Sequence, residues 1–551
     1  MDMKPVTIRV DTRKPMGPLD PIWRSIGYDE INWTYTPTGL DILHKIRGLN
    51  GGHFHIRNHN AFTSGDRQSR PFWGSTNCYT EDEAGNPCYD FSENDRIYDI
   101  FLENNCRPMI ELGFMPHDLS SQKQLGPKES WRYPPRDYSR WRELNQRFAV
   151  HLIQRYGRDE VRTWFFGVWN EPDLDDFYFR REPGKDLVND KEARRARNEE
   201  YCKLYDYATD GILSVDRQLR VGGPETADLE DDFVDVFFAH CRNGRNHATG
   251  ATGSRLDFVS FHCKATGMKN GRVPDPDFDL IVRRHLERFN EVLGRYPEFR
   301  QLPVLGNEWD IDWGTAYGIH DSPDWNFRNT SYYPVFVIRS IKELLDSRQR
   351  LNINLHLVTQ WAFYMRGKHC FEGARALFDP MGIRMPVFNA FEMLAKMGTT
   401  RIETSTDDDQ TDVAADRADT KIRPYPQVDA LATCNGEDIQ ALVWCQQADP
   451  NATGIRDINV VIEGLADHSS FMLSHYRIDE NHSNAYTAWK KLGSPEWPGS
   501  EQIAAMKKQE HLERLTPDTL QRATNGKLCL SFELPVHGVS LLLLTSRQES
   551  G

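Results

Sequence analysis

Short apolar runs alternate with longer amphipathic segments through the first 400 residues, and this alternation constrains the fold more than any other feature. Short apolar runs bounded by turn residues are typical of buried strands, and apolar residues spaced three or four apart are typical of helices. Strands that alternate with helices pair in parallel, and eight such units close into a TIM barrel. We therefore predict an α/β fold, a (β/α)8 barrel. The predicted strands are residues 22–27, 53–57, 108–114, 161–168, 220–223, 256–262, 303–308 and 355–361, and the predicted helices are residues 39–48, 95–104, 138–156, 199–215, 280–293 and 333–345.

The pattern changes near the C-terminus. Short alternating segments separated by turn residues predict an accessory β-sandwich, and a chain of 551 residues is too long for a single core. These segments are residues 429–445, 457–462, 471–478, 527–534 and 539–545. The predicted division is an N-terminal arm at 1–19 that joins the β-sandwich, a catalytic barrel at 20–400, an Asp-rich linker at 401–426 and a β-sandwich at 427–551.

Charge and composition narrow the class of partner. The formal net charge of −14 argues against a nucleic acid or an anionic membrane surface, and no apolar run is long enough to cross a bilayer. Aromatic residues make up 11% of the chain, which suits stacking on sugar rings. The N-terminus lacks the apolar core of a secretion signal, which predicts a cytoplasmic protein, although a chain trimmed of its signal would look the same. A homo-oligomer is left open.

Polar residues gather where the predicted strands end. Asn170 and Glu171 follow the fourth strand, and Pro172 stops that strand because it has no N–H and a fixed φ. The active site of a TIM barrel forms at the carboxyl ends of its strands, so these positions are candidates for chemistry. The other candidates are Arg57, Asn58, His59, Glu111, His262, Lys264, Glu308 and Trp361.

Glu171 and Glu308 follow strands four and seven, which face each other across a barrel mouth. A retaining glycosidase needs such a pair, because one carboxyl protonates the leaving oxygen and the other, roughly 5 Å away, attacks the anomeric carbon. Two carboxyl groups so close cannot easily both ionise, and aromatic surroundings favour a protonated acid. Without its partner, Glu171 would be an ordinary helix cap or ion-pair residue.

Several stretches of the chain, in order, match the motifs of one known family. They are residues 107–116 (RPMIELGFMP), 168–173 (VWNEPD), 221–224 (VGGP), 256–262 (LDFVSFH), 475–479 (HYRID), 482–486 (HSNAY) and 493–495 (GSP). On these stretches the chain resembles glycoside hydrolase family 39, the family of β-xylosidases and α-L-iduronidases. The resemblance runs from about residue 20 to about residue 545, and it implies Glu171 as the acid/base, Glu308 as the nucleophile and Asn170 as a partner of the sugar 2-hydroxyl. It also implies an oligosaccharide or small glycoside as substrate, with no metal or other cofactor.

The identity of the sugar is harder to predict from the sequence than the reaction, because β-D-xylosides and α-L-iduronides share their C1 configuration and differ at C5. Lys264 stands where the xylosidase pattern has tyrosine, and it resembles the iduronidase lysine that faces the uronate; Gly314 and the pair Arg57 and His59 resemble the same branch. The Gly-Phe-Met-Pro turn at 113–116 and the motifs after residue 475 resemble the xylosidases. We predict a neutral, β-xylosidase-like exo-glycosidase, with a uronidase as the alternative; Lys264 could also be a structural ion pair or a donor to a neutral sugar.

Histidines and tryptophans complete the predicted site. His53, His55 and His59 form an H-x-H-x-x-x-H pattern that could hold a metal, but His59, like His262, is interpreted as a sugar contact. Trp361 and Trp313 are either stacking platforms or core residues. A non-catalytic carbohydrate-binding barrel is the rival from another class, and the presence of both glutamates argues against it.

Overall fold

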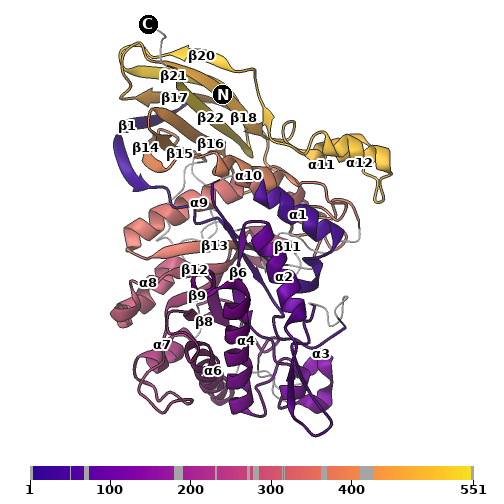
Figure 1. The fold of residues 1–551 in the computed structure, drawn as a ribbon. Coiled ribbons are helices and arrows are strands. Elements are labelled where there is room, and N and C mark those ends of the chain that lie inside the picture. The colour runs from indigo at the N-terminus through magenta and orange to yellow at the C-terminus, as the bar shows by residue number, and fades with distance from the viewer. Residues whose placement is uncertain are drawn as a thin grey trace.

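The computed structural model describes residues 4–49, 51–66, 74–178, 190–229, 233–265, 285–312, 314, 317–361, 369–409 and 427–547, together with the backbone of 266–269 and 273–276. Figure 1 shows two parts, a barrel surrounded by helices and a curled sheet beside it. Both the first and the last strand of the chain lie in the curled sheet. Among the described helices, none is both long and apolar enough to cross a membrane.

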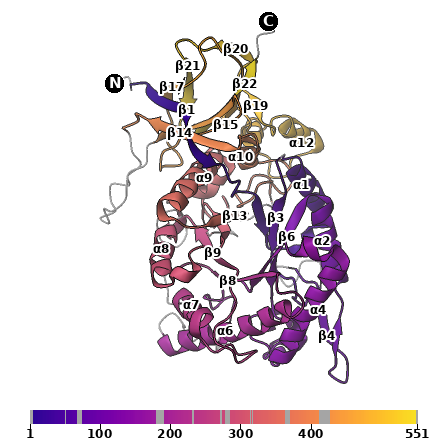
Figure 2. The ribbon, with the colours of Figure 1, turned by 60° about the vertical axis from the view of Figure 1, so that its left-hand side comes forward.

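Eight parallel strands close the barrel in the order β12-β13-β2-β3-β6-β7-β8-β9. Figure 2 shows these strands in the centre with the helices around them. The predicted TIM barrel and its eight strands are confirmed, although the fourth strand is shorter than predicted because Arg158–Val161 forms a helical turn, α5. The barrel strands are β2 (Ser25–Tyr28), β3 (Phe54–Asn58), β6 (Cys106–Leu112), β7 (Phe165–Val168), β8 (Arg220–Thr226), β9 (Phe258–Lys264), β12 (Val304–Asp310) and β13 (Leu355–Trp361).

The helices form the outer layer of the barrel. Helix α4 shows why the sequence folds this way: Asp137 caps it by accepting from the N–H groups of Ser139 and Arg140, and its apolar stripe is buried. Two helices, α7 and α10, were not predicted, because each is short and apolar over much of its surface. The helices are α1 (Pro37–Arg47), α2 (Ser92–Glu103), α3 (Pro127–Ser130), α4 (Tyr138–Tyr156), α6 (Lys191–Leu213), α7 (Phe233–Asn243), α8 (His285–Arg295), α9 (Tyr332–Leu351) and α10 (Pro386–Ala395).

Small elements lie in the loops that connect the strands and helices of the barrel. Two hairpins are formed by β4 (Tyr79–Glu81) with β5 (Pro87–Tyr89) and by β10 (Thr266–Lys269) with β11 (Val273–Pro276). The remaining helical turns are 3₁₀ helices at Ile31–Trp33, His117–Leu119, Lys123–Leu125, Pro297–Phe299 and Pro323–Asn329.

The second part is one curled sheet in the order β19-β18-β22-β16-β15-β14-β1-β17-β21, with β20 paired to β18. It has its own apolar core, and it corresponds to the predicted β-sandwich. Helices α11 (Ala485–Lys491) and α12 (Ser500–Lys507) interrupt it after β18 and were not predicted. Its strands are β1 (Val6–Pro18), β14 (Thr400–Thr406), β15 (Val428–Asn435), β16 (Asp438–Cys445), β17 (Ile455–Glu463), β18 (Ser470–Ile478), β19 (Glu513–Arg514), β20 (Thr519–Arg522), β21 (Lys527–Pro535) and β22 (Gly538–Arg547).

Strand β1 lies inside this sheet rather than at its edge. It pairs antiparallel with β14 and parallel with β17, so it connects β17 and β21 to the rest of the sheet. The predicted linker at 401–426 is wrong at its start: residues 401–406 belong to β14, whose threonines and buried Ile402 favour a strand. The rest of that linker, from 410 to 426, lies outside the described residues.

Helices α9 and α10 join the barrel to the curled sheet. They contact β16, β18 and β22, and the barrel core continues into the sheet through Leu442, Trp444 and Leu541. Two ion pairs reinforce this junction, Arg401 with Asp346 at 2.5 Å and Lys342 with Asp429 at 3.0 Å.

Candidate active site

Glu171 and Glu308 lie together at the carboxyl end of the barrel. Glu171 follows β7 with a left-handed φ of 43°, and its N–H donates to the carbonyl oxygen of Glu225 at 2.8 Å. His262 of β9 joins the two carboxylates, because its Nδ1 lies 2.8 Å from Glu171 Oε1 and 3.6 Å from Glu308 Oε2. One oxygen of each carboxylate and one ring nitrogen of His262 all lie within 4.8 Å of one another. Three of the predicted site residues are therefore brought to one point.

Glu308 is buried and surrounded by cations. Lys264 Nζ lies 2.5 Å from its Oε2, and Arg57 Nη1 lies 2.9 Å from its Oε1. Burial alone would raise the pKa of Glu308, but His262, Lys264 and Arg57 act against burial and hold that pKa well below its ordinary value. Glu308 is therefore an ionised carboxylate at neutral pH, as a nucleophile must be.

Arg57 of β3 is the centre of a buried polar network. Its Nη2 lies 3.1 Å from Glu111 Oε2, 2.8 Å from Asn170 Oδ1 and 3.0 Å from Glu225 Oε2. Burial would lower the pKa of Arg57, but these carboxylates raise it, so the guanidinium stays charged. A planar fork of donors suits this task, since it fixes several acceptors at once.

The side-chain amide of Asn170 has a hydrogen-bond partner at its oxygen but, in the described part of the chain, none at its nitrogen. Its Oδ1 accepts from Arg57, whereas its Nδ2 is buried and, among the described residues, has no hydrogen-bond partner. A buried amide N–H without a partner is costly, so it suits a site that a ligand oxygen completes.

Glu225 is the main site residue that sequence reasoning missed. It is buried at the end of β8 with a φ of 61°, and it accepts hydrogen bonds from Arg57, from Ser260 at 2.7 Å and from Asn307. Burial raises the pKa of Glu225, and the Arg57 guanidinium opposes this rise. The sequence pattern indicates Glu225 only weakly, because the matching stretch at 221–224 and the predicted strand both stop before this residue.

His59 lies beside Glu308 as a charged group. Its Nδ1 lies 2.5 Å from Glu111 Oε2, and its Nε2 lies 3.3 Å from Asp29 Oδ1 and 3.6 Å from Glu308 Oε1. Burial would lower the pKa of His59, but Glu111 and Asp29 raise it to about 10. The H-x-H-x-x-x-H alternative finds no support: His55 packs on Phe165 in the barrel interior, and four residues of strand separate it from His59 by about 13 Å.

The comparisons with known proteins decide the family. The sequence model of Glycosyl hydrolases family 39 matches residues 6–525. The chain belongs to glycosyl hydrolases family 39. It is therefore a glycoside hydrolase, and its substrate is a carbohydrate.

Relatives of two kinds stand out within family 39. A β-xylosidase from Caldicellulosiruptor saccharolyticus is 29% identical over 79% of both chains. An α-L-iduronidase from Mus musculus is 23% identical over 98% of this chain and 81% of its own. The fold is similar to that of a monomeric β-xylosidase from Caulobacter crescentus, with a TM-score of 0.75, 23% identity, and coverage of 98% of this chain and 99% of the other.

Gly314, a predicted sugar contact by resemblance to one branch of family 39, is engaged within the protein. Its N–H donates to Asp312 at 2.7 Å, and its carbonyl oxygen accepts from Arg328 at 2.6 Å. A Cβ at this position would approach the Trp325 ring to 2.4 Å, which explains the glycine. Arg375 forms a buried ion pair with Asp310 at 2.8 Å.

Trp361 lies against the cationic side of the site. Its ring lies 5.2 Å from the Arg57 guanidinium and 4.8 Å from the His59 ring, and a Cβ on Gly27 would overlap it at 2.1 Å. Only 1% of Trp361 is exposed, so it supports these two cations as a core tryptophan does. Trp313 lies outside the described residues.

Proposed function

We propose that the protein is a retaining, exo-acting O-glycosidase that removes a neutral, β-xylose-like sugar. Glu171 acts as the acid/base and Glu308 as the nucleophile. The observation that carries the proposal is the position of His262 between the two carboxylates, with carboxylate oxygens no more than 4.8 Å apart. Inverting enzymes need about 6.5–9.5 Å between carboxyl groups to admit a water, whereas retaining enzymes need about 5–5.5 Å.

The first step forms a glycosyl-enzyme. Glu308 Oε attacks the anomeric carbon while Glu171 gives its proton to the departing oxygen, so the bond to the aglycone breaks as the ester forms. In this proposal the Nδ2 of Asn170, which is buried and has no hydrogen-bond partner among the described residues, donates to the 2-hydroxyl, a contact that strengthens in the transition state. Apart from substrate and water, the proposed chemistry uses only these side chains.

The second step reverses the roles. Once Glu308 is an ester its negative charge is gone, and Glu171, relieved of a neighbouring carboxylate, has become a base. It takes a proton from water, whose oxygen attacks C1, and Glu308 leaves as a carboxylate stabilised again by Lys264 and Arg57. The product keeps the anomeric configuration of the substrate.

A neutral sugar is favoured because three cations that the structure describes at or after the ends of barrel strands are already paired. Lys264 donates to Glu308, Arg375 pairs with Asp310, and Arg328 forms a buried pair with Asp312 at 2.6 Å. The identity to the β-xylosidase relative also exceeds that to the iduronidase relative. The second candidate is a uronidase, which the position of the Lys264 ammonium beside the nucleophile supports.

The deciding experiment is a panel of aryl glycosides. It contains β-D-xyloside, β-D-galactoside, α-L-arabinoside and α-L-iduronide, each tested on the native enzyme and on Lys264→Ala. Turnover of a neutral glycoside with a retained anomer, read by NMR, supports the proposal. Turnover of the iduronide alone, abolished in Lys264→Ala, replaces it with the uronidase.

A further inference from the structure

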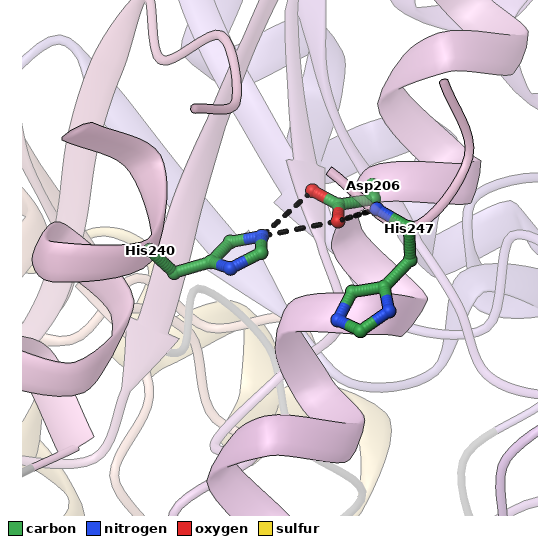
Figure 3. Close-up of side chains that lie close together, drawn as sticks. All are labelled: Asp206, His240 and His247. Carbon is green, nitrogen blue, oxygen red and sulfur yellow. Dashed lines mark hydrogen bonds and ion pairs between the residues drawn. The ribbon is translucent and has the colours of Figure 1, made fainter. Parts of the chain in front are cut away.

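A second cluster of metal-binding side chains lies on the outside of the barrel. Figure 3 shows Asp206 of α6, His240 of α7 and His247 of the loop after α7 close together, with Asp206 bonded to the His240 ring and to the backbone N–H of His247. That loop runs from the end of α7 to the start of β9, which is the end of the barrel opposite the carboxyl ends that carry Glu171 and Glu308. The cluster is therefore separate from the catalytic site.

The distances within the cluster are those of potential ligands. His240 Nε2 lies 3.0 Å from both carboxylate oxygens of Asp206. One carboxylate oxygen and one nitrogen from each ring all lie within 4.8 Å of one another. The two rings are nearly parallel, with centroids 5.7 Å apart and an angle of 18° between them. Ser254 adds an oxygen, since its Oγ lies 3.3 Å from His240 Nε2.

Two imidazoles and one carboxylate form a donor set that zinc prefers, usually with tetrahedral geometry and a water in the fourth position. Zinc bonds of about 2.0–2.1 Å place tetrahedral donors about 3.3 Å apart. The Asp206 and His240 donors already stand near this separation. His247 is exposed and sits in a loop, so its ring can complete the approach.

The hydrogen bonds of Asp206 offer a simpler explanation of the cluster, in which no metal binds. The role of the His247 side chain distinguishes this explanation from a metal site. Asp206 accepts from His240, from the Ser254 hydroxyl and from the backbone N–H of His247 at 2.7 Å, which together tie the loop to α6. The His247 side chain contributes no hydrogen bond to this arrangement among the described residues. Without a metal, the described contact of the His247 ring is its stacking on the His240 ring, whereas a metal site would also use a ring nitrogen.

We propose that Asp206, His240 and His247 form a binding site for a divalent transition metal of the zinc class. The metal fixes the loop between α7 and β9 against α6, so its effect falls on stability rather than on the chemical step. This inference does not depend on the identity of the sugar.

The test is zinc binding to the full-length protein after dialysis against a chelator, measured by calorimetry and by metal content. We expect one strong zinc per chain in the native protein, and a rise in Tm of about 2 °C at 100-fold excess over Kd. His247→Ala should weaken binding at least 100-fold while leaving the hydrogen bonds of Asp206 and the glycosidase activity in place. Cobalt(II) should give the intense visible absorption of a tetrahedral site in the native protein and not in His247→Ala.

A control is needed because Glu171, His262 and Glu308 also hold donor atoms within 4.8 Å of one another. Glu308→Gln removes one of these ligands, and we expect it to bind the zinc with native affinity. Native zinc affinity in His247→Ala, or loss of binding in Glu308→Gln alone, overturns the proposal, as does a native protein that binds no zinc.

Discussion

The ammonium of Lys264 donates a hydrogen bond to the Glu308 carboxylate at 2.5 Å. Lys264 ends β9 and Glu308 lies in the adjacent strand β12, so the contact is fixed by the barrel itself rather than by a mobile loop. This relationship gives the lysine a role with a neutral sugar. In the proposed mechanism it keeps Glu308 ionised before attack and stabilises the carboxylate again as it leaves the ester.

Replacing Lys264 should therefore change the pH dependence of turnover of a neutral glycoside. The ammonium helps to hold the pKa of Glu308 below its ordinary value, so in Lys264→Ala that pKa rises. Since only the ionised carboxylate attacks, the acidic limb of kcat/KM should move to higher pH. Lys264→Arg keeps the charge and is the control. An acidic limb that is the same in all three proteins would remove this role from Lys264.

Replacing Glu171 should show a dependence on the leaving group. Without a general acid, Glu171→Gln should lose about 10²–10⁴-fold in kcat/KM for glycosides with poor leaving groups. The loss should be much smaller for activated aryl glycosides, because their leaving groups depart without a proton. Added azide should restore turnover of Glu171→Ala and give a glycosyl azide of retained configuration. A uniform loss across leaving groups would contradict the acid/base assignment.

His59 should make the protein less stable at alkaline pH. Its pKa is about 10 in the folded protein against an ordinary value of 6.5, so its contribution is complete below pH 6.5 and is lost as the pH rises toward 10. The full contribution is at most about 5 kcal/mol. The free energy of unfolding, measured with urea, should fall less steeply between pH 6.5 and 9.5 in His59→Gln than in the native protein. His468→Gln, at an exposed position, is the control and should follow the native curve.

The barrel could be predicted from the sequence because each strand and helix carries its own local pattern. The contacts across the site could not, because they depend on strand register, which local patterns do not specify. The register between β12 and β9 pairs Glu308 with His262 and Asp310 with Lys264, and this register places the lysine beside Glu308. Glu225 was missed for a related reason: the predicted strand ends at residue 223, yet β8 continues to Thr226 with a register shift.

The role of Glu225 can be tested by a substitution that removes no polar side chain. A Cβ on Gly167 would come within 2.2 Å of Glu225 Oε1, so Gly167→Ala should displace that carboxylate and loosen its hold on Arg57. We expect a loss of about 1–3 kcal/mol in the free energy of unfolding, as for other overpacked sites, and a lower kcat/KM. Gly294 of α8 has no neighbour within 4 Å of such a Cβ. Gly294→Ala should keep full activity and gain up to about 1 kcal/mol; equal behaviour of the two variants would argue against a role for Glu225.

The N-terminal strand offers a test of the domain division. We propose that residues 1–19 and 427–551 form one folding unit, because β1 lies between β14 and β17 and Ile8 is fully buried in the core of the sheet. Ile8→Asp places an unpaired charge in that core and should cost roughly 3–5 kcal/mol. Met16→Asp makes the same change at an exposed position of β1 and should stay within about 0.5 kcal/mol of the native protein. Urea unfolding and limited proteolysis should place the new cleavage sites of Ile8→Asp in residues 427–547. Cleavage first within the barrel, or equal stability of the two variants, would mean that the arm does not fold with the curled sheet.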